Sequence, residues 1–104
     1  MAGLTVYWTL TAKRQRDHVF AYWTERNKST SYSMKLGIAI KERTALLRQF
    51  PGMGVATDFR DVRAVSMGHY TLLYKLAEPR IIIVGFWDNR QDPGVLLRHI
   101  LSNQ

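Results

Sequence analysis

Three side chains, Arg63, His69 and Arg90, are of types that could act on a phosphodiester. A histidine can serve as a general acid or base near neutral pH, and an arginine can hold a phosphate through charge-assisted hydrogen bonds. Each also has a simpler structural explanation. A single histidine between two predicted strands is more often a solvated turn residue, and aspartates lie near both arginines in the sequence, so structural ion pairing is favoured for them.

Other kinds of catalytic or binding site find no support in the sequence. The chain has no cysteine, which excludes disulfides, a thiolate nucleophile and a thiolate metal site. His18, His69 and His99 are too dispersed to suggest a metal site, and there is no glycine-rich phosphate loop. His18 and Tyr22 share a helix face, which is an ordinary surface pair. We therefore expect no metal and no cofactor.

Net charge is the first indication of function. The 104 residues carry 15 Lys and Arg against 8 Asp and Glu, a net charge of +7. Residues 1–52 hold nine of these bases and three of the acids, whereas residues 53–104 hold six bases and five acids. Such a surplus attracts nucleic acid or an acidic protein, and a surface charged only for solubility is the plainer alternative.

Length and hydropathy predict one small domain over residues 1–104. A composition that is 46% hydrophobic is typical of a globular chain with a single core. The longest apolar run, residues 81–87, is too short for a membrane-spanning helix, which needs roughly 20 residues. The first ten residues do not have the pattern of a signal peptide. We expect a cytoplasmic protein without membrane contact.

The first half of the chain predicts a strand and two helices. Residues 4–10 alternate between apolar and polar side chains, which indicates a strand. A helix is predicted over residues 12–27 with Thr11 as its cap, and a second begins near residues 29–31 and ends at Pro51-Gly52. So short a connection predicts an antiparallel helical hairpin. The predicted apolar face of the second helix consists of Tyr32, Leu36, Ala39, Ile40, Leu47 and Phe50.

The second half predicts three strands after an irregular stretch from Met53 to Arg60. The strands span about 61–66, 70–76 and 80–87, and their short connections suit β-hairpins. The last strand is apolar at both alternating positions, as in a strand covered on both faces or one that offers a face to a partner. Residues 94–101 are compatible with a short terminal helix. The expected class is α+β, with an N-terminal strand, a helical hairpin and a three-stranded antiparallel meander.

This order of elements and several segments resemble the RelE/ParE toxin superfamily of bacterial toxin–antitoxin systems. The segments are Val6–Thr9 running into Thr11-Ala12, Leu46–Gly54, Val62–Val65 before Gly68–Tyr74, and Phe86–Pro93. The last of them is similar to the ParE-like, plasmid-stabilisation branch. The resemblance implies a growth-inhibiting toxin that is neutralised by a cognate antitoxin, usually encoded beside it.

Two activities share this superfamily fold, because RelE-like members cut mRNA on the ribosome and ParE-like members poison DNA gyrase. Where RelE-like sequences carry an arginine after the first residue of the central strand, this chain has Thr71, and the preceding strand offers only Arg63. The catalytic His-Tyr pair of YoeB-like toxins is replaced by residues 90–93, Arg-Gln-Asp-Pro. Tyr70 and Tyr74 would stack bases in a nuclease, but they lie on the apolar side of their strand, which favours core positions.

These departures favour a non-enzymatic ParE-like toxin that binds gyrase. The alternative is a metal-independent, ribosome-dependent mRNA interferase, in which Arg63, His69 and Arg90 would be the catalytic residues. A non-toxic basic domain that binds nucleic acid is a third hypothesis. For a toxin we expect an acidic antitoxin, disordered when free, that folds over the helices and the sheet with apolar anchors and with carboxylates facing Lys and Arg.

Overall fold

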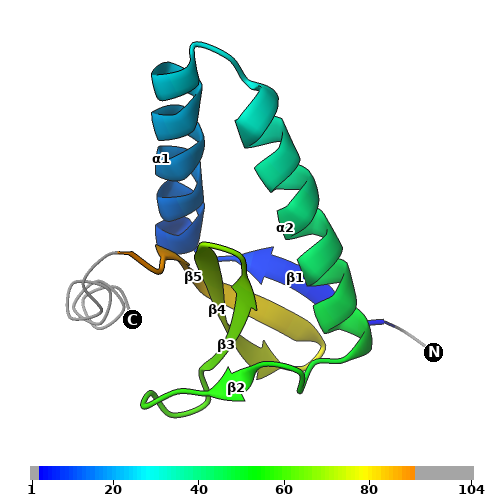
Figure 1. Cartoon of the computed structure of the whole chain (residues 1–104). Helices are drawn as coiled ribbons and strands as arrows, with labels where there is room; N and C mark the ends of the chain where they lie inside the picture. Colours follow the sequence, from blue (N-terminus) through cyan, green and yellow to red (C-terminus); the bar gives the residue numbers. More distant parts are fainter. Residues whose placement is uncertain (1–2, 91–104) are drawn as a thin grey trace.

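A computed structural model describes residues 3–90 as a helical hairpin packed on one five-stranded sheet (Figure 1). The elements are β1 (Thr5–Trp8), α1 (Leu10–Asn27), α2 (Ser31–Gln49), β2 (Val55–Ala56), β3 (Arg63–Met67), β4 (Tyr70–Ala77) and β5 (Arg80–Asp88). The predicted α+β class is confirmed. The helix predicted over 94–101 lies outside the described residues. Within those residues no helix is long and apolar enough to cross a bilayer.

The sheet has five strands and is mixed, which extends and corrects the predicted three-stranded antiparallel sheet. Strands β3, β4 and β5 do form an antiparallel meander, but β1 pairs in parallel with β5, and the sheet order is β1-β5-β4-β3-β2. A parallel pair needs a long connection, and here the helices and the other strands lie between its members. Strand β2 adds an edge beside β3 within the stretch that was expected to be irregular. Two residues are too few for an alternating pattern to reveal.

Two predicted details of the helices are wrong. Helix α1 is capped by Thr9 instead of Thr11, because the Thr9 hydroxyl accepts a hydrogen bond from the Ala12 amide at 3.1 Å. Leu10 therefore opens the helix and is 61% exposed, whereas the alternating pattern placed it in the strand. Phe50 caps the C-terminal end of α2, where it leaves the helical periodicity, and it is 60% exposed instead of joining the apolar face.

The main core lies between the helices and one face of the sheet. A register shift between Leu73 and Tyr74 leaves Val84 without a partner in β4, and this bulge reverses the alternation of β5. Because of the bulge, apolar residues at odd-numbered positions before Val84 and at an even-numbered position after it face the helices. The buried members of this core are Ala12, Leu36, Ile40, Leu47, Val65, Met67, Tyr70, Leu72, Tyr74, Ile81, Ile83 and Phe86. A smaller cluster contains Val62, Leu73 and Trp87.

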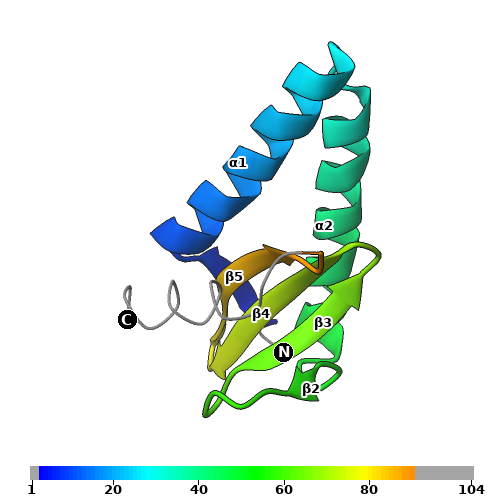
Figure 2. The same ribbon diagram turned by 60° about the vertical axis from the view of Figure 1, so that its left-hand side comes forward.

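The two helices meet at their connection and diverge toward the sheet (Figures 1 and 2). Near the connection the Ser33 hydroxyl donates to the Phe20 carbonyl at 2.9 Å and lies 2.9 Å from the Thr24 hydroxyl. The rings of Trp23 and Tyr32 pack 4.9 Å apart, centroid to centroid. The hairpin is thus closed by specific contacts at one end, while the sheet holds its other end open.

Candidate functional site

The three predicted catalytic residues do not converge. His69 lies exposed in the turn between β3 and β4, and Arg90 follows β5. These two positions are neighbours, because the Asn89 amide donates to the His69 carbonyl at 2.8 Å. Arg63 begins β3 and is in register with Tyr74. The length of β3, about 13 Å of extended strand, therefore separates Arg63 from the turn.

Arg63 has a structural contact other than the predicted ion pair. Its Nη1 donates to the carbonyl of Gly54 at 2.8 Å, which ties the start of β3 to the loop before β2. The carboxylate of Asp61 instead lies 3.9 Å from Arg60. The predicted pairing of Arg63 with an aspartate is therefore wrong within the described residues, and its guanidinium is committed to the backbone.

The predicted ion pair of Arg90 is confirmed. Its Nε and Nη2 donate to the two carboxylate oxygens of Asp88 at 2.9 and 2.7 Å, and its backbone amide also donates to Asp88 at 2.9 Å. These hydrogen bonds hold the pKa of Asp88 below its usual value and raise the pKa of Arg90. A guanidinium that donates two hydrogen bonds to one carboxylate has few donors left for a phosphate.

Thr71, at the position of the RelE-like arginine, belongs to a neutral network. Its hydroxyl donates to Asn89 Oδ1 at 2.6 Å, and Asn89 Nδ2 donates to the Gly68 carbonyl at 3.3 Å. Thr71 therefore contributes no positive charge at this end of the sheet. Residues 3–90 also hold no cluster of His, Asp or Glu that could bind a metal ion.

Tyr70 and Tyr74 belong to the core, as predicted, with 2% and 0% of their surfaces exposed. The Tyr70 hydroxyl accepts a hydrogen bond from Trp23 Nε1 at 2.7 Å, and burial raises the Tyr70 pKa. The Tyr74 hydroxyl donates to the Pro51 carbonyl at 2.8 Å and accepts from the Gly54 amide at 2.9 Å. Neither ring is free to stack on a base.

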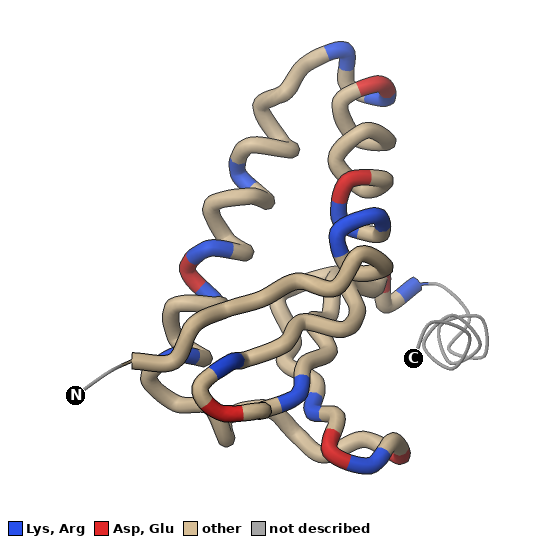
Figure 3. Tube along the Cα trace, turned by 180° about the vertical axis from the view of Figure 1, so that it is seen from behind, with Lys and Arg blue, Asp and Glu red and all other residues tan. Residues whose placement is uncertain are grey.

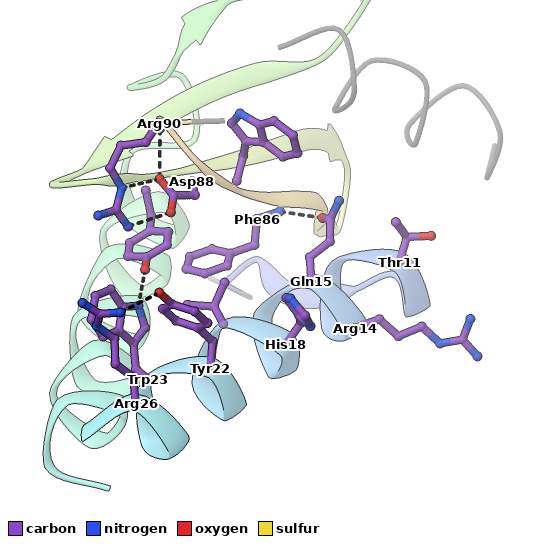
Figure 4. A pocket seen from close by; sticks show the side chains of 13 residues that line it. Thr11, Arg14, Gln15, His18, Tyr22, Trp23, Arg26, Phe86, Asp88 and Arg90 are labelled. Carbon is purple, nitrogen blue, oxygen red and sulfur yellow. Dashed lines mark hydrogen bonds and ion pairs between the residues drawn. The ribbon is translucent and has the colours of Figure 1, made fainter. Parts of the chain in front are cut away.

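A groove of about 850 Å³, here called the α1 groove, lies between α1 and the end of β5 (Figure 4). Its α1 wall carries Arg14, His18, Tyr22 and Arg26, which recur at every fourth residue. In the sequence, His18 and Tyr22 stand out only as a surface pair, and extending their spacing by one turn each way identifies both arginines. The other lining residues are Thr11, Gln15, Val19, Trp23, Tyr70, Phe86, Trp87, Asp88 and Arg90.

A second groove of about 480 Å³, here called the hairpin groove, runs between the two helices beside β1. Its walls include the aliphatic side chains of Met34 and Ile38, which are 64% and 57% exposed. Two cations also line it, Arg16 and Lys41, and the Arg16 guanidinium lies 4.8 Å from the centre of the Trp8 ring. The Arg16 side chain is thus accommodated by an aromatic contact.

Both grooves are positively charged. Lys and Arg are spread over both helices, which carry few acids (Figure 3). Asp17 pairs with Arg16 at 3.1 Å and Glu25 pairs with Lys28, and neither acid lines a groove. Among the residues from 3 to 90, Asp88 is the one carboxylate that lines either groove, and Arg90 neutralises it. An anionic partner is therefore favoured at both places.

Comparisons with known proteins point to a single family. The family model described as "ParE toxin of type II toxin-antitoxin system, parDE" matches residues 6–93. Eight chains of solved structures also match, among them one titled "Chromosomal ParDE TA system from P. aeruginosa", with a TM-score of 0.71 and 17% identity over 82% of this chain and 95% of that one. A search of curated proteins finds no significant match. Since the family model spans most of its length, the chain belongs to the ParE toxin family of type II toxin–antitoxin systems.

Proposed function

We propose that this ParE-family toxin inhibits growth by binding DNA gyrase and not by cutting mRNA. The observation that supports the proposal is that Arg63 is separated from His69 and Arg90, and that both arginines are engaged in structural contacts. Arg63 donates to a backbone carbonyl, and Arg90 donates two side-chain hydrogen bonds to Asp88. Metal-free RNA cleavage needs charged donors around the phosphate, and the loss of one such donor typically costs on the order of 10²–10³ in rate. A toxin that acts by binding has no such requirement.

One observation favours mRNA cleavage as a second candidate. His69 and Arg90 lie at the same end of the sheet, joined through the backbone by the hydrogen bond from Asn89. For Arg90 to hold a phosphate there, it would first have to leave Asp88 and give up two short charge-assisted hydrogen bonds. Neutral Thr71 cannot supply the missing charge.

Two assays with the purified chain distinguish these candidates. In a translation reaction followed by primer extension on the message, we expect no new 3′ ends. In a parallel reaction with gyrase and relaxed plasmid, we expect loss of supercoiling. Codon-phased 3′ ends that disappear in the His69→Ala variant would refute the proposal, because His69 is exposed and its replacement leaves the core intact.

We also propose that an acidic antitoxin segment binds in the hairpin groove. The exposed side chains of Met34 and Ile38 suit the apolar anchors of an amphipathic helix. Lys41 suits a carboxylate on its flank, and so do the donors of Arg16 that its pairing with Asp17 through Nε leaves over. Such a segment would be disordered when free and would fold on the toxin. The toxin and antitoxin would meet in the cytoplasm, where gyrase works.

Stopped-flow mixing with the protein encoded beside the toxin tests this contact. The association rate should fall steeply with salt, because screening weakens the long-range attraction. Ile38→Asp should weaken the complex by about tenfold or more, since it places a carboxylate against an acidic partner. Leu76→Asp, at a 43% exposed position outside both grooves, is the matched control and should bind normally. An association rate that ignores salt, or an Ile38→Asp complex of full affinity, would contradict the proposal.

A further inference from the structure

We infer that the α1 groove binds the phosphate backbone of single-stranded nucleic acid. This inference does not depend on gyrase or on an antitoxin. The two grooves differ in chemistry: Met34 and Ile38 expose aliphatic surface in the hairpin groove, whereas the α1 groove is lined by three arginines, a histidine and the half-exposed ring of Tyr22. Figure 4 shows His18 and Tyr22 projecting from α1 toward β5, between Arg14 and Arg26.

The α1 wall offers cationic donors along a line. Arg14 and Arg26 are twelve residues apart on one helix face, which is about 18 Å, and His18 lies between them. Neither arginine makes an ion pair with any residue from 3 to 90. Arg26 donates to the Tyr22 hydroxyl at 3.4 Å, a contact that leaves its charge available. A row of this length suits an extended chain with several anionic groups better than a single anion.

Free acceptors are scarce in the α1 groove. Both carboxylate oxygens of Asp88 already accept hydrogen bonds from Arg90. The side-chain oxygen of Gln15 accepts from the Phe86 amide at 2.9 Å. A ligand that supplies many acceptor oxygens and negative charge therefore complements this groove, and a run of phosphates has both properties.

An aromatic ring is held in place between the two arginines. Half of the Tyr22 surface is exposed, and its ring packs edge-on against Trp23 at 5.1 Å between centroids. Trp23 is itself fixed by its hydrogen bond to the Tyr70 hydroxyl, so the packing against Trp23 positions the Tyr22 ring. A fixed, half-exposed ring beside cations is a platform on which a base can stack. The bases of a duplex are already stacked on one another, so the groove matches a single strand.

An acidic peptide is the competing ligand, since its carboxylates would also accept hydrogen bonds from arginine. Such a peptide brings aliphatic anchors, for which the hairpin groove offers Met34 and Ile38, and it has no base to stack on Tyr22. The fixed ring of Tyr22 therefore decides in favour of nucleic acid.

Fluorescence anisotropy with the full chain tests the inference. The probes are labelled octathymidylate and octauridylate, titrated between 50 and 200 mM salt as ordinary conditions for such binding. We expect binding that weakens with salt. Arg14→Ala/Arg26→Ala should reduce the slope of log K against log salt by about 1.4, because each contact with a single-strand phosphate contributes about 0.7. The control Lys35→Ala/Arg43→Ala removes equal charge from α2, at positions that line neither groove, and should leave the slope unchanged.

Substitutions of Tyr22 test the stacking platform. Tyr22→Ala should weaken binding about 5- to 150-fold, and Tyr22→Phe should bind like the wild type. All of the substituted side chains lie on helix surfaces, and circular dichroism would verify that each variant folds. The inference is overturned by absent binding, by equal effects of the two double variants, by an unaffected Tyr22→Ala, or by octaglutamate binding as tightly as the oligonucleotides. Gyrase is absent from this assay, so the result does not depend on whether the chain inhibits gyrase.

Discussion

The hydroxyl of Tyr74 ties the loop between α2 and β2 to the centre of the sheet. It donates to the Pro51 carbonyl at 2.8 Å and accepts from the Gly54 amide at 2.9 Å, and both Tyr74 and Gly54 are buried. Tyr74→Phe removes one oxygen atom and leaves the ring in place. The variant therefore measures how much these two hydrogen bonds contribute to the free energy of unfolding.

We expect Tyr74→Phe to lower the free energy of unfolding by about 2–3 kcal/mol. A buried polar group without a hydrogen-bond partner costs about 1–3 kcal/mol. In the variant the Gly54 amide would be such a group, whereas the carbonyl of half-buried Pro51 would be partly hydrated and would cost less. For a domain of this size, each kcal/mol lowers the melting temperature by about 4–8 °C, so the midpoint should fall by about 8–24 °C.

Urea titration followed by circular dichroism measures this loss, and Tyr7→Phe is the matched control. Tyr7 is 50% exposed, and its hydroxyl makes no hydrogen bond with any residue between 3 and 90. Its ring would keep the contact with the Arg80 guanidinium, 5.6 Å away. The control should change by less than about 0.5 kcal/mol. Equal losses in both variants, or a stable Tyr74→Phe, would refute the assigned role of the buried hydroxyl.

Three further substitutions test other contacts by the same urea titration. Gly54→Ala should be strongly destabilising, because the new methyl group would lie 2.7 Å from the Tyr74 ring, whereas Gly52→Ala meets nothing within 4 Å and should be tolerated. Asp88→Asn should be less stable than the wild type at pH 7, and the difference should shrink as the pH falls toward 3. Hydrogen bonds from Arg90 lower the pKa of Asp88, so the stabilisation is present above the pKa of unfolded aspartate and is lost as the pH falls through the lower native value. A difference that is independent of pH would contradict that cause.

The sequence is informative about the fold wherever a pattern is long. Alternation over 70–76 and the apolar run of 81–87 predict β4 and β5 closely. The pattern cannot show the bulge at Val84, which turns both parities of β5 toward the helices, because the bulge depends on pairing with β4. The cap at Thr9 was missed because Thr11 has the same side chain and both precede the helical pattern.

The candidate site is less predictable because its contacts join distant segments. Arg90 and Asp88 are two residues apart, and their pairing was foreseen. The partner of Arg63 is a backbone carbonyl nine residues away, which no pattern of charges indicates. The wall of the α1 groove is visible as a four-residue spacing in the sequence, but its opposite side comes from β5 and becomes apparent only in the folded chain.

The most direct test of the gyrase proposal is supercoiling by purified gyrase at increasing concentrations of the folded chain. Relaxed plasmid serves as substrate, and the heat-unfolded chain is the control. We predict that supercoiling is lost as the folded chain approaches and exceeds the concentration of gyrase, while the unfolded chain has no effect. Full supercoiling at a large excess of folded chain would contradict gyrase as the target.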